Sequence, residues 1–267
     1  MDSNEIGMLD ISGIKMPYAR IGQESKPFVI LPGLSLSLMT PLARVVGMHY
    51  QAFLDAGYTL YVFDRRVNAP ADYTQQDMAD DTAACMEHLG IQGAAVMGAS
   101  QGGMIAQLLA ADYPRLVDRV MLCSTCAVCE GPTTASVRQW IELARARQGK
   151  ALADSFGGLI YSPKVWAANQ KAVEALCEGA ADQDFERFVI MASALLGFDA
   201  TAKLEQVSVP AFVVGAQGDR VIPIAAMRDL AARLGCQSYF YDASFGHAVY
   251  DEAPDFVGKL LAFCRQP

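Results

Sequence analysis

The sequence is poor in histidine, in positive charge and in long apolar runs, and the last two shortages each exclude a class of protein. Its 267 residues include three histidines, and 29 acidic residues outnumber 21 basic ones, which gives a net charge of −8. An acidic surface repels phosphate groups, so we expect neither nucleic acid nor membrane among the partners. No run of about 18 uninterrupted apolar residues occurs, so no transmembrane helix is predicted.

The N-terminal residues and the cysteines predict the compartment. Residues 1–5 lack the basic region and the apolar run that a secretory signal peptide would show. The seven cysteines are an odd number and are scattered along the chain, which does not suit a disulfide framework. Both features predict reduced thiols in the cytoplasm.

The most informative stretch that is present reads Gly-x-Ser-x-Gly, at residues 98–102. Small apolar residues precede it, as in a buried strand, and helix-forming residues follow it. Ser100 is therefore predicted to lie on a sharp strand-to-helix turn, the nucleophile elbow, with Gly98 and Gly102 providing the space that such a turn needs. The backbone amide of Gln101, at the start of the helix, can point at an oxyanion formed on a substrate.

A serine hydroxyl becomes a good nucleophile when a base takes its proton, and the three histidines narrow the choice of base. His49 and His88 lie within predicted helices, whereas His247 lies in a turn after the last predicted strand. A loop just beyond a strand end suits a base, so His247 is predicted to serve Ser100.

The base in turn needs a carboxylate that orients it. Asp219 directly follows an apolar strand and is the predicted partner of His247, with Asp242 and Asp251 as weaker alternatives. Asp251 is more typical of a cap for the last helix. The chain order is then Ser100, Asp219, His247, which differs from the order in chymotrypsin and in subtilisin.

Hydrophobic patterning predicts alternating strands and helices with one interruption. Strands are predicted at 6–12, 15–21, 28–31, 58–63, 93–97, 119–123, 211–215 and 237–241. Helices are predicted at 40–56, 75–89, 104–111, 134–148, 150–157, 163–178, 183–197, 223–234 and 254–264. The alternation favours an α/β fold, a mostly parallel sheet with helices on both faces. We predict a core domain of residues 1–126 and 206–267, and a helical cap of residues 127–205 that roofs the carboxyl ends of the strands.

Three segments carry a resemblance to a known family: the elbow at 97–103, Gly218 to Pro223, and Gly246-His247. Together they resemble the α/β-hydrolase family along nearly the whole chain, in particular members with a helical cap after the sixth strand. The resemblance implies a mostly parallel eight-stranded sheet. It also implies a second oxyanion amide at Leu34, which follows Pro32-Gly33 where the family usually has His-Gly.

Two further comparisons with the family concern the elbow and the loop after the fourth strand. Haloalkane dehalogenases and epoxide hydrolases of the family use aspartate at the elbow, so Ser100 argues against both. The family often has Asp-x-Arg-Gly-x-Gly-x-Ser where this chain has Asp64 to Ala71, which lacks those glycines. This loop is therefore expected to shape the pocket differently.

The substrate pocket and the cysteine cluster are harder to predict. Candidates for contact with the substrate are Leu36, Cys126, Trp140 and Trp166, although aromatic residues of a cap are core residues by default. Cys123, Cys126 and Cys129 form Cys-x-x-Cys-x-x-Cys, which is compatible with a metal site or a redox site. No fourth ligand lies nearby in the sequence, so we expect neither a metal nor a cofactor.

The sequence thus predicts a serine hydrolase acting on a carboxylic ester, or a related acyl bond, of a small and mainly apolar substrate. The same triad serves acyl transfer to an alcohol or thiol and the hydrolysis of carbon–carbon bonds, so both remain alternatives. A different class is also open: a protein that kept this fold and binds a ligand without turnover. The oligomeric state is left open.

Overall fold

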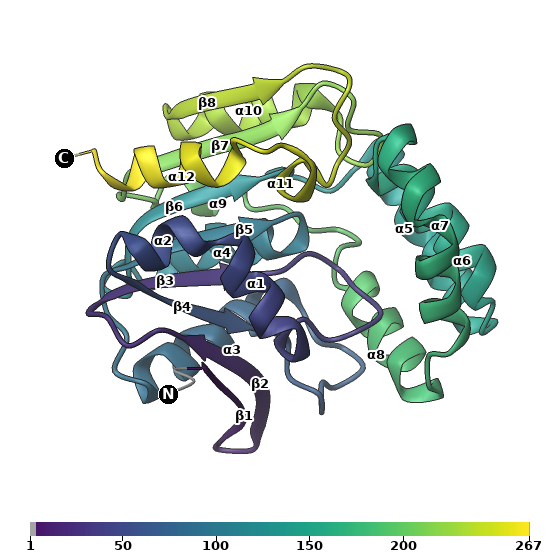
Figure 1. Cartoon of the computed structure of the whole chain (residues 1–267), viewed down its shortest axis with the longest axis horizontal. Helices are drawn as coiled ribbons and strands as arrows, with labels where there is room; N and C mark the ends of the chain where they lie inside the picture. The colour runs from purple at the N-terminus through teal and green to yellow at the C-terminus, as the bar shows by residue number, and fades with distance from the viewer. Residues whose placement is uncertain (1–3, 267) are drawn as a thin grey trace.

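The predicted strands assemble into one sheet. The structure, a computed structural model, describes residues 4–266, and these residues contain an eight-stranded sheet in the order β1-β2-β4-β3-β5-β6-β7-β8 (Figure 1). β2 runs antiparallel to both of its neighbours, and the remaining pairs are parallel. The strand bounds are Asn4–Ile11 (β1), Ile14–Ile21 (β2), Lys26–Leu31 (β3), Tyr58–Phe63 (β4), Ala94–Ala99 (β5), Val117–Cys123 (β6), Ala211–Ala216 (β7) and Gln237–Tyr241 (β8).

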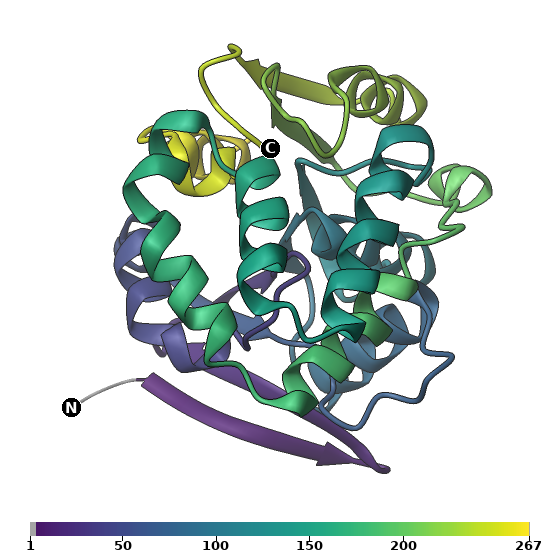
Figure 2. The same ribbon diagram turned by 90° about the vertical axis from the view of Figure 1, so that its right-hand side faces the viewer.

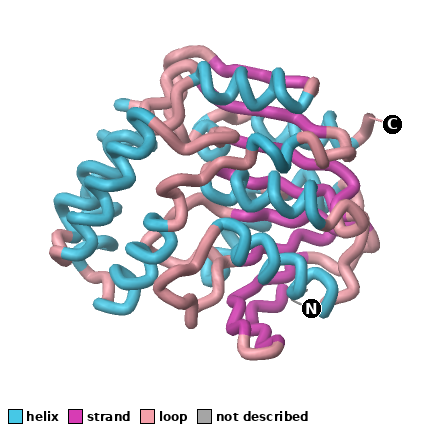
Figure 3. Tube along the Cα trace, turned by 180° about the vertical axis from the view of Figure 1, so that it is seen from behind, coloured by secondary structure: helices cyan, strands magenta, loops and turns pink. Residues whose placement is uncertain are grey.

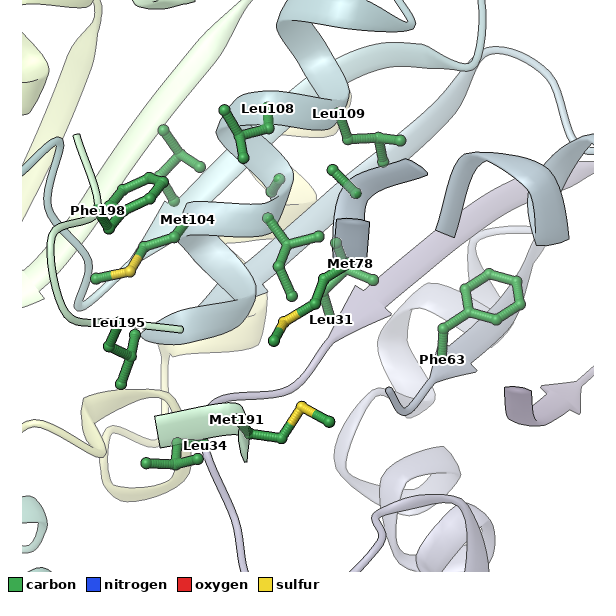
Figure 4. Packing of buried hydrophobic residues seen from close by; sticks show 14 of the residues in the cluster. Leu31, Leu34, Phe63, Met78, Met104, Leu108, Leu109, Met191, Leu195 and Phe198 are labelled. Atoms are coloured by element: carbon green, nitrogen blue, oxygen red, sulfur yellow. The ribbon is translucent and has the colours of Figure 1, made fainter. Parts of the chain in front are cut away.

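Helices cover both faces of the sheet (Figure 3), and the central strands are correspondingly apolar over most of their length. All six residues of β5 and all six of β7 are buried. Two hydrophobic clusters result, one on each face. One cluster includes Phe28 and Phe53, and the other includes Leu31 and Met104, part of which Figure 4 shows. The predicted α/β fold class is confirmed.

The helices that cover the sheet are α1 (Ala43–His49), α2 (Gln51–Asp55), α3 (Gln75–His88), α4 (Gln101–Asp112), α9 (Thr201–Leu204), α10 (Ile224–Leu234), α11 (Val249–Glu252) and α12 (Phe256–Cys264). Of these, α3, α10 and α12 lie within two residues of their predicted bounds, α4 begins three residues before its predicted start, and α9 and α11 are not predicted. Thr74 caps α3 through the backbone amide of Asp77, whose carboxylate accepts the Thr74 amide in return. None of the helices within residues 4–266 combines the length and the apolar character that crossing a bilayer requires.

Two predicted helices differ from the structure. The helix predicted at 40–56 is divided into the 3₁₀ turn Thr40–Leu42, α1 and α2, with a break at Tyr50 (φ −97°, ψ 24°). Tyr50 is buried against the rings of Phe28 and Phe53, and this packing replaces a continuous helix. Asp251 does not cap the last helix, because it lies within the unpredicted helix α11 and α12 starts after Asp255.

Between β6 and β7 the chain forms the insertion, defined here as helices α5 (Gly131–Arg145), α6 (Gly149–Ile160), α7 (Pro163–Glu178) and α8 (Asp182–Ser193). These helices lie beyond the carboxyl ends of the parallel strands (Figure 1), and Figure 2 shows them from outside. α6 and α7 pack tightly at Gly157, where an added Cβ would overlap the ring of Trp166. The insertion therefore stands over the edge of the sheet where Ser100 emerges.

Candidate active site

Ser100 lies at the strained turn between β5 and α4. Its backbone has φ 52° and ψ −118°, a conformation that costs a non-glycine residue roughly 1–3 kcal/mol. A Cβ added at Gly98 would overlap the carbonyl of Gly102, and one added at Gly102 would overlap the carbonyl of Leu31. The Ser100 amide donates to the Cys123 carbonyl at 2.8 Å, which fixes the turn to β6. The local sequence thus holds Ser100 at the tip of a sharp turn.

His247 and Asp219 form a buried pair. His247 Nδ1 donates to Asp219 Oδ2 at 2.7 Å, and the two residues are only 2% and 8% exposed. The other oxygen, Asp219 Oδ1, accepts the backbone amides of Val221 and Ile222, each at 2.8 Å. Because the carboxylate occupies Nδ1, Nε2 is the nitrogen that remains free to accept a proton.

The two alternative carboxylates serve other contacts. Asp242 is exposed and accepts the backbone amide of Ser244 at 2.8 Å, and hydrogen bonds from Ser244 lower the pKa of Asp242. Asp251 lies in α11 near His49. The structure therefore brings Asp219, among the three candidates, to His247.

Ser124 fixes the loop that carries His247, and the sequence analysis missed it. Ser124 Oγ donates to the His247 carbonyl at 2.7 Å, and the Ser124 amide donates to Val214 at 2.8 Å. Its φ of 45° turns the chain sharply after β6. Its position in the sequence could have identified Ser124, because a polar residue directly after a parallel strand lies at the ligand-binding edge of the sheet.

The His247 loop also contacts the insertion. The Ala248 amide donates to the Ile160 carbonyl at 3.0 Å, and a Cβ added at Gly246 would lie 2.7 Å from that same oxygen. Glu252 accepts the amides of both Ser162 and Gly246, at 2.7 and 3.1 Å. The end of α6 and the loop that carries His247 are thus held in one hydrogen-bonded unit.

Asp64 and Arg65 hold the loop after β3, which contains Leu34. Arg65 Nη1 donates to the Pro32 carbonyl at 2.8 Å, and Nη2 donates to the Gly33 carbonyl. Asp64 accepts the amides of Met39 and Thr40 at the other end of the loop. Burial lowers the pKa of Arg65 to about 10, opposed by the charge of Asp64, so Arg65 remains a cation at neutral pH. This pair provides fixed backbone anchors at both ends of the loop.

The side chain of Gln101 links this loop to the insertion. Its Oε1 accepts from Arg65 Nη2 at 3.1 Å, and its Nε2 donates to the Met191 carbonyl of α8 at 2.6 Å. Arg187, also on α8, donates to the carbonyl of Leu36. Gln101 is fully buried, so its backbone amide is fixed at the N-terminus of α4.

A cavity of about 20 Å³ lies beside Ser100. Its lining combines the loop after β3, the elbow, the insertion and the loops after β7 and β8: Gly33, Leu34, Ser100, Met104, Thr133, Val137, Trp140, Phe156, Ile160, Leu195, Val221, Ile222, His247 and Tyr250. Gly33 allows the close approach, because a Cβ there would lie 3.2 Å from Ser100 Cβ. The structure thus places Ser100, His247 and Leu34 around one small apolar space.

Of the four predicted substrate contacts, Trp140 lines this cavity, whereas Leu36, Cys126 and Trp166, all within the described residues, do not. Leu36 is buried in the core cluster, and its carbonyl accepts from Arg187. Cys126 is also in the core, and Trp166 packs on Gly157 inside the insertion. These residues are predicted as substrate contacts from their hydrophobicity, but hydrophobicity does not predict which face of a helix or strand a side chain occupies.

The three clustered cysteines lie on different faces of the sheet. Cys123 belongs to the cluster around Phe28, and Cys126 and Cys129 belong to the cluster around Met104. Burial raises the pKa of all three thiols, which disfavours the thiolate that a metal needs. Within residues 4–266, no group of three His, Cys, Asp or Glu side chains is arranged to hold a metal.

Comparison with known proteins assigns the family. A family model described as the alpha/beta hydrolase fold matches residues 26–254. The chain belongs to the α/β-hydrolase family. This α/β-hydrolase is 26% identical over 222 residues to the provisionally named carbamate hydrolase RutD of Pantoea ananatis, covering 79% of each chain.

Two further similarities agree with this assignment. The protein is 24% identical over 222 residues to 3-oxoadipate enol-lactonase 2 of Acinetobacter baylyi, covering 81% of this chain and 80% of the relative. Its fold is similar to that of MGS-M2, an alpha/beta hydrolase from a deep-sea metagenome library, with a TM-score of 0.86, 20% identity and 98% coverage of both chains.

Proposed function

We propose that this α/β-hydrolase is a serine hydrolase that cleaves a carboxylic ester, or a related acyl bond, of a small and mainly apolar substrate. The observation that carries the proposal is the position of Ser100 on a strained elbow, beside a cavity that His247 also lines. The 2.7 Å contact between His247 and Asp219 supports it, because a base needs this orientation. One relative is named as an enol-lactonase, and a lactone is a cyclic ester.

In the proposed reaction Ser100 Oγ attacks the substrate carbonyl while His247 Nε2 takes the hydroxyl proton. Asp219 stabilises the imidazolium that forms. The amides of Leu34 and Gln101 donate to the oxyanion. The imidazolium then gives its proton to the leaving alcohol, which departs from the acyl-enzyme. Water attacks the acyl-enzyme with His247 as base, and the acid leaves.

We further propose that residues 127–205 act as a lid. A space of about 20 Å³ beside Ser100 holds about one water molecule, whereas ligand pockets have about 300–1,000 Å³. The insertion provides Thr133, Val137, Trp140, Phe156 and Ile160 to this space, so its movement would enlarge it. The enclosed, apolar character of the space also favours acyl transfer as a second candidate, because bulk water competes poorly there. Carbon–carbon bond hydrolysis and binding without turnover would use the same lid.

Labelling with a fluorophosphonate tests the nucleophile. The probe is expected to modify Ser100 and no other residue, because a fixed base and two oxyanion donors activate this hydroxyl alone. Intact-protein mass spectrometry of the wild type and Ser100→Ala measures the label, and hydrolysis of p-nitrophenyl acetate and butyrate is followed in the same samples. Labelling or hydrolysis that persists in Ser100→Ala would contradict the assignment. Binding of esters without labelling or hydrolysis would favour the non-catalytic alternative.

Substrate charge is expected to have a large effect. His247 and Tyr250 are the titratable side chains in the lining of the cavity, within the described chain, and neither Arg65 nor Arg66 reaches it. An anionic acyl group would lose its hydration without compensation. We expect kcat/KM to rise from acetate towards butyrate or hexanoate esters, by up to about fourfold per methylene, and to fall for an acyl group that carries a carboxylate. A preference for the charged ester would show that the pocket holds a cation.

A further inference from the structure

A second, larger chamber lies on the other side of the loop that contains Leu34. Its volume is about 320 Å³. It is walled by β3, by α1 with the turn before it, and by the ends of α6 and α11. The two spaces have five lining residues in common: Gly33, Leu34, Phe156, Ile160 and Tyr250. The two spaces therefore share part of their walls.

The sizes of the two spaces determine where a substrate has room. The space beside Ser100, of about 20 Å³, accommodates little more than the reacting carbonyl group. A chamber of about 320 Å³ is large enough for the rest of a small ester. Resting on the proposed function, we propose that this chamber is a substrate subsite that holds the larger of the two substituents of the scissile ester, an uncharged aliphatic or aromatic group.

The side chains that line the chamber determine which kind of ester substituent it can hold. Most are apolar: Ile30, Val62 and Met97 come from β3, β4 and β5, Val45 and Val46 come from α1, and Phe156 comes from α6. The lining also includes one acidic side chain, Asp251, and one histidine, His49, which lie near each other and are both exposed. Apolar walls stabilise an aliphatic or aromatic substituent, whereas an anionic substituent would lose its hydration against them.

The outer face of α1 and of the turn before it is unusually apolar. Leu42, Val45 and Met48 are 47%, 61% and 71% exposed, and they follow one another at three-residue intervals. Leu42 and Val45 line the chamber, whereas Met48 does not. Val45 and Met48 are therefore a matched pair: two exposed apolar residues of one helix, one of which lies at the chamber and one away from it.

The experiment compares Val45→Trp with Met48→Trp. The larger ring at residue 45 is expected to occupy the mouth of the chamber, so the ratio of kcat/KM for a long ester to that for a short one falls by at least about tenfold, the effect of losing contact with two methylene groups. Met48→Trp is expected to leave this ratio within twofold of the wild type. Two series locate the occupant, p-nitrophenyl acyl esters from acetate to octanoate and alkyl acetates from methyl to hexyl. A selective loss in either series supports the subsite.

An unchanged ratio in both series for Val45→Trp, or an equal loss for every ester, would overturn the subsite. Equilibrium dialysis of p-nitrophenyl hexanoate with Ser100→Ala and with Ser100→Ala/Val45→Trp gives a second readout that needs no turnover. At least tenfold weaker binding to the double variant supports the subsite, and equal binding rejects it. Failure of the hydrolase proposal can be told apart from failure of the subsite. If the protein is not a serine hydrolase, fluorophosphonate labelling is absent in the wild type as well as in Val45→Trp.

Discussion

Ser100→Ala and His247→Ala are each expected to lower kcat for an activated ester by roughly 10⁴–10⁶, because serine and base act as one unit. In the proposed reaction, Ser100→Ala removes the nucleophile, and His247→Ala leaves the hydroxyl with its proton. The double variant is expected to lose little more than either single variant. Asp219→Asn should cost somewhat less than either, since it removes the partner that orients His247 at 2.7 Å.

The matched control is His88→Ala. His88 is exposed at the end of α3 and lines neither the cavity nor the chamber, so its replacement should leave kcat within twofold of the wild type. Steady-state kinetics with p-nitrophenyl butyrate measures the wild type and the five variants, and circular dichroism shows that each is folded. Losses that multiply in the double variant would mean that Ser100 and His247 act independently, which the triad does not allow.

The sequence predicts much of the fold because buried parallel strands are continuous apolar runs. The strands at 58–63 and 237–241 match their predicted bounds, and the elbow strand is extended by two residues to Ala99. What patterning could not predict depends on packing. Tyr50 has good helix formers on both sides, yet its contacts with Phe28 and Phe53 interrupt the helix. α11 is a single short turn with little periodicity.

In the candidate site, too, features set by neighbouring residues could be predicted, whereas features set by residues distant in the sequence could not. The turn that carries Ser100 is encoded by five adjacent residues, so the sequence predicts it. Ser124 and Arg65 act through backbone carbonyls that lie 123 and 33 residues away, and no local pattern marks such contacts. Similarly, the apolar character of Leu36 and Trp166 predicts burial without predicting which space they face. Residue type therefore predicts the chemistry, and the fold decides which side chains reach it.

Arg65→Met is expected to lower kcat by about 10²-fold, close to the effect of losing one oxyanion donor. Arg65 donates to the carbonyls of Pro32 and Gly33 and to the side chain of Gln101, so it fixes both residues that flank the proposed oxyanion site. Methionine fills a similar volume but leaves these buried acceptors unpaired, at a cost of about 1–3 kcal/mol in the free energy of unfolding. Arg65→Lys keeps the charge, and its kcat should lie between that of the wild type and that of Arg65→Met.

Arg66→Met is the matched control, because the neighbouring arginine contacts Asp81 at 3.4 Å and the ring of Tyr73 instead of the loop. Losing that contact should change stability while leaving kcat within a few-fold of the wild type. Urea unfolding separates the two effects, and the rate of fluorophosphonate labelling reports the oxyanion site directly, since the phosphonyl oxygen occupies it. If Arg65→Met labels at the wild-type rate, or if Arg66→Met slows labelling as much, the loop after β3 does not depend on Arg65. A selective loss of labelling and of kcat with little change in KM would show that Arg65 positions the amide of Leu34 for the transition state.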